Sequence, residues 1–136
     1  MCGISGIFSS HELGESDKAL GRKIIDELVH RGPDYKGEFE SKNKKAFLGH
    51  NRLSIIFNKP EGNQPMEINE NVISFNGEIY NYKYLANKYF NGIKNYGDTE
   101  ILLRMWNKFG ENSLEKIDGM YAFALYDNDN LYLASD

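Results

Sequence analysis

The hydrophobic residues of the chain fall into short runs that alternate between strand spacing and helix spacing. Residues 2–9 form an apolar run that predicts a buried strand. Residues 20–28 then carry apolar side chains at helical spacing, with Ser16 as the expected N-cap. The Gly-Pro pair at residues 32–33 is expected to stop this helix. The chain is therefore predicted to open with a strand and one helix.

The middle of the chain is predicted to consist mainly of strands. Residues 37–40 and 45–56 predict two strands that pair through a hairpin at residues 41–43. Residues 72–75 predict a further strand. That strand is expected to end at the Asn-Gly pair of residues 76–77, which is a common turn dipeptide.

The second half of the chain carries two helical segments and a final hairpin. Residues 82–90 predict a helix, and a second helix begins at Asp98, presents an apolar face and ends at Gly110. Residues 120–126 alternate as a strand, and residues 131–134 return after a polar turn. Hairpins grouped between helices predict a layered fold with largely antiparallel sheets. We expect this domain to continue past the last hairpin, whose edge is left open.

Size and charge restrict the classes of protein and partner. The chain has 136 residues, 40% of them hydrophobic and 26% charged, which is typical of a single globular domain. Its net charge of −4 disfavours nucleic acid and anionic membranes as partners, because both carry phosphate charge. The single cysteine excludes an internal disulfide, and no apolar run reaches the roughly 20 residues that span a bilayer. These features predict a cytoplasmic protein.

The one cysteine stands at position 2, directly after the initiator methionine. Because cysteine is small, we expect Met1 to be removed, which gives Cys2 a free α-amine beside its thiol. An α-amine titrates at about pH 7.7–8.0 and a free thiol at about pH 8.5. The amine is therefore suited to take the thiol proton and later to protonate a leaving group. The alternatives are a small buried strand residue and a dyad of Cys2 with His50.

Hydrolysis of a carboxamide by this thiol requires hydrogen-bond donors for the tetrahedral oxyanion. The candidates are the side-chain amide of Asn76 and the backbone N–H of Gly77, which no side chain obstructs. The alternative is an ordinary hairpin turn, because Asn-Gly is a frequent turn dipeptide. The dipeptide by itself leaves both interpretations open.

An amino acid substrate also presents an α-carboxylate and an α-ammonium group. Arg52 is a candidate for the carboxylate, since a guanidinium binds it through two hydrogen bonds; an outward-facing strand residue is the alternative. Glu78 and Asp98 are candidates for the ammonium, and Asp98 also fits a helix N-cap. The sequence shows no metal-ligand spacing and no glycine-rich phosphate loop.

Seven short motifs follow one another in an order that resembles a known family. They are MCGISGI at residues 1–7, HRGPD at 30–34, GHNRLSI at 49–55, QPM at 64–66, FNGEIYN at 75–81, GDTE at 97–100 and DGMYAFA at 118–124. Together they resemble the glutaminase domain of class II glutamine amidotransferases, which are N-terminal-nucleophile hydrolases. The similarity is greatest to the amino-terminal domain of glutamine-hydrolysing asparagine synthetases, and it covers nearly the whole chain.

The resemblance implies a fold and three catalytic groups. The implied fold is an α+β, four-layer α/β/β/α sandwich of mainly antiparallel sheets. Cys2 is implied as the nucleophile, and Asn76 with Gly77 as the oxyanion hole. The implied reaction is hydrolysis of the glutamine side-chain amide to glutamate and ammonia through a Cys2 thioester.

The resemblance also implies how L-glutamine is bound. Arg52 is implied to bind its carboxylate, Glu78 and Asp98 its amino group, and the Ile55 carbonyl a further part of it. The loop at residues 30–34 is implied to order over the substrate.

Two departures from the family limit what the chain is expected to do. Residues 135–136 are Ser-Asp where the family has Arg-Asp, and the family's domain continues into further strands and a synthetase domain. We therefore expect a domain truncated at its C-terminus, with no cofactor of its own, because ATP and magnesium belong to the synthetase domain that forms asparagine. The alternatives are a non-catalytic remnant that binds glutamine or docks a partner, and a glutaminase that serves another acceptor, such as a sugar.

Overall fold

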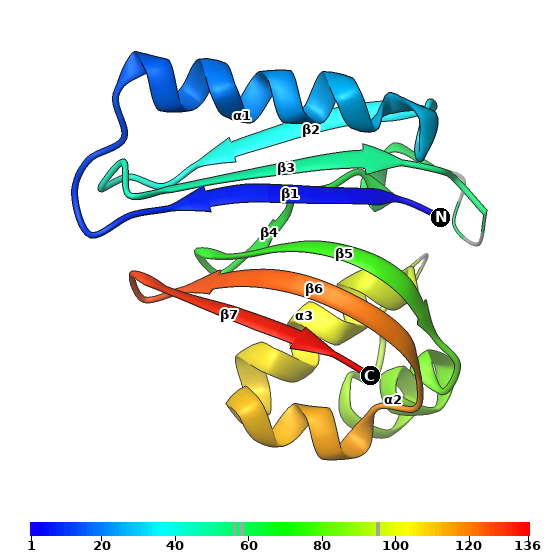
Figure 1. Ribbon diagram of the computed structural model, residues 1–136. Helices are drawn as coiled ribbons and strands as arrows, with labels where there is room; N and C mark the ends of the chain where they lie inside the picture. The colour runs from blue at the N-terminus through cyan, green and yellow to red at the C-terminus, as the bar shows by residue number, and fades with distance from the viewer. Residues whose placement is uncertain (56, 58, 95) are drawn as a thin grey trace.

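The chain folds into two antiparallel sheets that pack face to face, with helices on both outer sides (Figure 1). The computed structural model describes residues 1–55, 57, 59–94 and 96–136. The strands are β1 (Gly3–Phe8), β2 (Tyr35–Glu40), β3 (Ala46–Arg52), β4 (Met66–Ile68), β5 (Asn71–Ile79), β6 (Gly119–Asp127) and β7 (Asn130–Ser135). The α-helices are α1 (Glu15–Glu27), α2 (Tyr82–Tyr89) and α3 (Asp98–Phe109). Short 3₁₀ segments are Leu28–His30, Pro60–Gly62 and Gly110–Lys116.

The order of the layers is helix, sheet, sheet, helix. One sheet has the strand order β1-β3-β2 and is covered by α1, while the other has the order β4-β5-β6-β7 and is covered by α2 and α3 (Figure 1). All strand pairs are antiparallel. This arrangement confirms the expected α+β sandwich of four layers.

Strand β3 shows how the alternation of side chains divides the core. Phe47 faces α1 and packs with Leu13 and Ile25. The neighbours Ala46 and Leu48 point the other way, into the space between the sheets. All seven residues of β3 are buried, as expected for a central strand covered on both sides.

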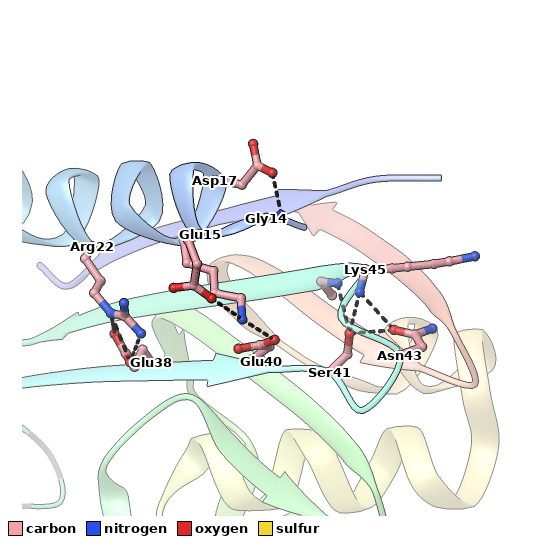
Figure 2. A network of polar contacts seen from close by, with 11 residues as sticks. Gly14, Glu15, Asp17, Arg22, Glu38, Glu40, Ser41, Asn43 and Lys45 are labelled. Atoms are coloured by element: carbon pink, nitrogen blue, oxygen red, sulfur yellow. Dashed lines mark hydrogen bonds and ion pairs between the residues drawn. The ribbon is translucent and has the colours of Figure 1, made fainter. Parts of the chain in front are cut away.

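Charged pairs join α1 to the neighbouring strand β2 (Figure 2). Arg22 contacts Glu38 at 3.0 Å and Lys18 contacts Glu40 at 2.9 Å. The pair of Arg22 and Glu38 is exposed, and exposed pairs contribute little to stability. The side of α1 that faces the sheet therefore contributes more to its position, and there a side chain at Gly21 would strike the ring of Phe47.

The structure corrects the predicted N-caps of two helices. The first begins at Glu15 with Gly14 as its N-cap, so the prediction of Ser16 is wrong; the Gly14 N–H donates to the Asp17 carboxylate at 2.8 Å instead. The helix α3 begins at Asp98, as predicted, but its N-cap is Gly97, so the alternative of Asp98 as an N-cap is wrong. Its predicted end at Gly110 is confirmed.

Two strand predictions also need correction. Strand β5 continues through Asn76 and Gly77 to Ile79 and pairs with β6 throughout, so the Asn-Gly dipeptide is not a turn. Strand β3 ends at Arg52, earlier than predicted, and Ile56 lies outside the described residues. Among the described residues, no helix is long and apolar enough to cross a membrane.

Candidate active site

A cavity of about 180 Å³ is lined by both sheets, near the start of β1 and the end of β3. The seven residues predicted from the sequence all line it: Cys2, Arg52, Ile55, Asn76, Gly77, Glu78 and Asp98. Ile55 is 74% exposed and marks the rim, whereas Arg52 and Asp98 are buried. The fold thus gathers one thiol, one guanidinium and two carboxylates from four separate stretches of chain.

Cys2 lies just before β1, with its side chain half-buried against the segment that follows β3. The Leu53 N–H donates to the Cys2 sulfur at 3.3 Å, and the sulfur lies 3.7 Å from the Leu53 carbonyl oxygen. The backbone carbonyl of Cys2 accepts a hydrogen bond from Arg31 Nε at 3.1 Å. Met1 is 62% exposed and lines the same cavity, so the start of the chain lies beside the thiol.

The backbone groups of β5 alternate in direction, as antiparallel pairing requires. Both backbone groups of Phe75 point away from β6: its N–H donates to Gln64 Oε1 at 2.7 Å and its carbonyl accepts from His50 Nε2 at 3.0 Å. Four residues later, the Ile79 N–H donates to Asp98 Oδ2 at 3.2 Å. Gly77 lies midway between them, so its N–H also points away from β6, at a position that lines the cavity.

Only glycine fits at position 77. Its φ is +155°, and a Cβ atom there would strike the backbone carbonyl oxygen of Met120 on β6. Within the described part of the chain, no side chain accepts a hydrogen bond from the Gly77 N–H. This N–H is therefore an available donor beside the half-buried side chain of Asn76.

Arg52 is buried and held by a set of hydrogen bonds, so the alternative of an outward-facing strand residue is wrong. Nη1 donates to the Lys59 carbonyl at 2.8 Å and to Asn63 Oδ1 at 2.7 Å, and Nη2 donates to the Phe57 carbonyl. These bonds fix the plane of the guanidinium while the residue lines the cavity. A positive charge is thereby presented in one orientation.

Asp98 is a buried carboxylate whose partners are backbone N–H groups. Oδ2 accepts from Ile79 and Oδ1 accepts from Thr99 at 3.0 Å. Burial raises the pKa of Asp98 above its usual value, the two backbone hydrogen bonds oppose this, and the nearby charge of Glu78 raises it further. Among the described residues, neither Asp98 nor Glu78 forms an ion pair with a lysine, arginine or histidine. The cavity therefore has a negative side that lacks a cation.

His50 takes no part in a dyad with Cys2. It is fully buried between the sheets, where burial lowers its pKa from 6.5 to about 4 despite the hydrogen bond to Phe75. The imidazole is thus neutral near pH 7 and carries its proton on Nε2, which faces the Phe75 carbonyl. The hydrogen-bonding partners of the Cys2 sulfur are instead the backbone groups of Leu53.

Sequence reasoning assigned no role to Gln64 and named no contact for Arg31 or Asp34 in the loop at residues 30–34. Gln64 is buried, lines the cavity and contacts both β5 and α3. Asp34 accepts a hydrogen bond from the Ser54 N–H at 2.7 Å, so the loop at residues 30–34 is attached to the cavity wall through Asp34 and Arg31. Both residues 64–66 and residues 30–34 belong to the seven motifs found in the sequence, so their importance could have been recognised. The motifs do not, however, specify which atoms make contact. No group of three or more His, Cys, Asp or Glu suited to a metal occurs among the described residues.

Comparison with known proteins places this site in a family. Residues 1–136 match the glutamine amidotransferase domain. The chain is 37% identical to asparagine synthetase [glutamine-hydrolyzing] 1 of Bacillus subtilis, with 100% of this chain and 22% of the relative covered. It is 34% identical to asparagine synthetase B [glutamine-hydrolyzing] of Escherichia coli, with 95% and 24% covered. It is also 33% identical to amidase chry2 of Gibberella zeae, with 98% and 22% covered.

The similarity runs through nearly the whole chain but through only a part of each relative. The chain spans about a quarter of the length of the curated relatives that it matches. The match over residues 1–136 includes every residue that lines the cavity. The chain belongs to the glutamine amidotransferase domain family.

Proposed function

We propose that this protein, once Met1 is removed, hydrolyses the side-chain amide of L-glutamine to glutamate and ammonia, with Cys2 as the nucleophile. One observation carries the proposal: one cavity is lined by a thiol, a fixed guanidinium, and a backbone donor and two carboxylates for which the described residues supply no partner side chain and no cation, respectively. Membership of the glutamine amidotransferase domain family supports glutamine as the substrate.

The chemistry starts at the N-terminus of the mature chain. The free α-amine of Cys2, directly or through one water, takes the thiol proton, and the thiolate attacks the side-chain carbonyl carbon of glutamine. Leu53 supports this step, because its N–H is directed at the sulfur and stabilises negative charge there. Attack breaks the carbonyl π bond and places the electron pair on oxygen, which gives a tetrahedral oxyanion.

The oxyanion is bound by donors on β5. The Gly77 N–H and the Asn76 side-chain amide are the proposed donors, and a lost donor of this kind typically lowers kcat by about 10²–10³-fold. The intermediate then collapses, the C–N bond breaks, and the Cys2 ammonium gives its proton to the departing nitrogen as ammonia leaves. Water attacks the resulting thioester, which releases glutamate and restores the thiol and the amine.

The two charged ends of glutamine orient it in the cavity. Arg52 binds the α-carboxylate, and Asp98 with Glu78 binds the α-ammonium, which supplies the cation that these carboxylates lack. The Ile55 carbonyl at the rim is a further proposed contact. Orientation of this kind is valuable, because a displacement of about 1 Å costs roughly 100-fold in rate.

The use of the ammonia is proposed from the relatives. Two of them are named as glutamine-hydrolysing asparagine synthetases, so we infer that the ammonia supplies asparagine formation by a synthetase domain that uses ATP and magnesium. The glutaminase step itself needs no metal or cofactor in this scheme. We infer a cytoplasmic location from the single cysteine, which cannot form an internal disulfide.

Replacement of the nucleophile tests the reaction. Cys2→Ser keeps a small residue at position 2, so removal of Met1 is preserved and is checked by intact-mass measurement. The parent is expected to release glutamate from glutamine, and the variant to lose at least about 10³-fold in kcat. Calorimetry on the variant is expected to show retained glutamine binding. Glutamate release by Cys2→Ser at the parental rate contradicts the mechanism, and binding without turnover in the parent favours a non-catalytic glutamine-binding domain.

A further inference from the structure

Strand β5, which carries the proposed oxyanion donors, extends beyond the end of its neighbour β4. In the β4–β5 ladder, Met66 lies opposite Ile73 and Ile68 opposite Asn71. Continued by two residues, the same register places Gln64 opposite Phe75. The strand β4 begins only at Met66, so no backbone carbonyl of β4 meets the Phe75 N–H.

The side chain of Gln64 occupies the missing place in the ladder. Gln64 is 5% exposed, and its Oε1 accepts from the Phe75 N–H at 2.7 Å, where a backbone carbonyl would accept in a continued strand. Its other end, Nε2, donates to Thr99 Oγ1 at 3.3 Å. One neutral amide thus joins β5 to the first turn of α3.

This amide and Asp98 tie the same two elements on opposite sides of Gly77. Gln64 binds Phe75 two residues before Gly77, and Asp98 binds Ile79 two residues after it. All three backbone N–H groups lie on the same edge of β5. The free Gly77 N–H is therefore held between two fixed neighbours, and its direction depends on both ties.

We propose that Gln64 is a positioning residue that aims the Gly77 N–H at the reacting carbonyl. This inference rests on the proposed glutaminase function. A glutamine side chain suits the position, because it accepts from an N–H and donates to a hydroxyl without adding charge beside the developing oxyanion. A carboxylate there would add a negative charge near the developing oxyanion and would repel it.

Gln64→Met removes both hydrogen bonds and keeps a side chain of similar length. We expect kcat for glutamine to fall about 10- to 100-fold with little change in KM, because the lost alignment acts on the transition state. Thr99→Val, which removes one of the two bonds, is expected to have a smaller effect, and Thr99→Ser to restore parental kcat. The double variant of Gln64→Met and Thr99→Val is expected to lose no more kcat than Gln64→Met alone, because the two side chains act as one unit.

The rate of Cys2 alkylation distinguishes a misaligned Gly77 N–H from a general collapse of the site. Alkylation of Cys2 by iodoacetamide displaces iodide and forms no oxyanion, so its rate reports the thiol and its access but not the donors. In Gln64→Met this rate is expected to stay within about twofold of the parent while kcat falls. A parallel loss of alkylation and turnover contradicts the positioning role.

Ser74→Ala is the matched structural control. Ser74 is buried next to Phe75 on β5, its hydroxyl donates to the Gly49 carbonyl of β3 at 2.9 Å, and it is not among the residues that line the cavity. It is expected to lose stability but to keep the parental kcat.

The experiment compares kcat, KM and the rate of Cys2 alkylation for the parent, Gln64→Met, Thr99→Val, Thr99→Ser and Ser74→Ala in the processed protein. A fall in kcat confined to Gln64→Met and Thr99→Val supports the proposal. With an active parent, unchanged kcat in Gln64→Met, or an equal fall in Ser74→Ala, overturns the positioning role alone. A parent that releases no glutamate overturns the proposed function itself, and the positioning role with it.

Discussion

The carboxylate of Asp98, at the start of α3, accepts a hydrogen bond from the backbone N–H of Ile79 on β5 at 3.2 Å. The bond fixes the distance between the negative side of the cavity and the strand that bears Gly77. It also leaves Asp98 buried with backbone partners and no cation among the described residues. A buried carboxylate in this setting favours a ligand that brings a positive charge.

Asp98→Asn tests the role of this charge. The amide keeps the size of the side chain but loses the attraction for the substrate ammonium, so KM for glutamine is expected to rise about 100-fold, with a smaller change in kcat. Asp26→Asn is the control, because Asp26 is an exposed residue of α1 that pairs with Lys36. Steady-state kinetics of both variants give the answer, and equal KM values for Asp98→Asn and the parent would remove Asp98 from the binding site.

Arg52→Lys tests whether the guanidinium itself is required. Lysine keeps the positive charge, but its single ammonium cannot bind Lys59, Asn63 and Phe57 and also grip a carboxylate through two parallel hydrogen bonds. We expect KM to rise about 10- to 100-fold. Glutamine binding to the Cys2→Ser form of the same variant, measured by calorimetry, should weaken by the same factor. Unchanged binding would show that the carboxylate lies elsewhere.

Gly77→Ala tests the close approach of β5 to β6. The added methyl group meets the Met120 carbonyl at a φ of +155°, so β5 must shift at the proposed oxyanion donor. We expect kcat to fall at least about 100-fold and the free energy of unfolding to fall by several kcal/mol, on the order of 2–4. Gly14→Ala is the control, since an added Cβ there meets only ordinary contacts. Thermal unfolding and kinetics measure both effects, and a fully active Gly77→Ala would refute the steric argument.

The lowered pKa of His50 is expected to make the free energy of unfolding depend on pH. Its folded-state pKa is lowered from 6.5 to about 4, because burial disfavours the charged ring. Between these two pKa values the unfolded chain binds a proton at His50 that the folded chain does not. The contribution of His50 to the free energy of unfolding is therefore fully present above pH 6.5 and is lost as pH falls towards 4. The loss amounts to about 3 kcal/mol.

His50→Gln isolates this contribution, because its amide can still donate to the Phe75 carbonyl but does not titrate. Denaturant unfolding at pH 7 and at pH 4.5 measures the stability of the parent and the variant. The parent is expected to lose more stability between these values, since other titrating groups act equally in both. An identical loss in the two proteins would mean that folding does not lower the pKa of His50.

The sequence predicted the layers and the members of the site better than it predicted the local ends of elements. Hydrophobic spacing located α1, α3 and the final hairpin, and the ordered motifs singled out residues that the fold brings to one cavity. Local turn chemistry failed at Asn76 and Gly77, because continuous pairing with β6 overrides the preference of Asn-Gly for a turn. Helix capping failed at Ser16, because the Asp17 carboxylate already binds the Gly14 N–H.

Other parts of the site depend on register, which short sequence patterns do not specify. The role of Gln64 follows from its place opposite Phe75 at the end of a ladder that begins at Met66. The orientation of His50 depends on which face of β3 meets the second sheet. Both relationships join residues that are separated in sequence, so they depend on how the strands pair and how the two sheets pack.

The most direct measurement of the central claim compares two forms of the protein that differ only at the N-terminus. One form has Met1 removed, and the other is released from an N-terminal fusion by a protease that leaves Met1 in place before an unchanged Cys2, with both states verified by intact mass. Glutamate release from glutamine is then measured at equal protein concentration. The account predicts turnover only in the form whose Cys2 amine is free, because that amine is the base. Equal turnover by the form that retains Met1 would contradict it.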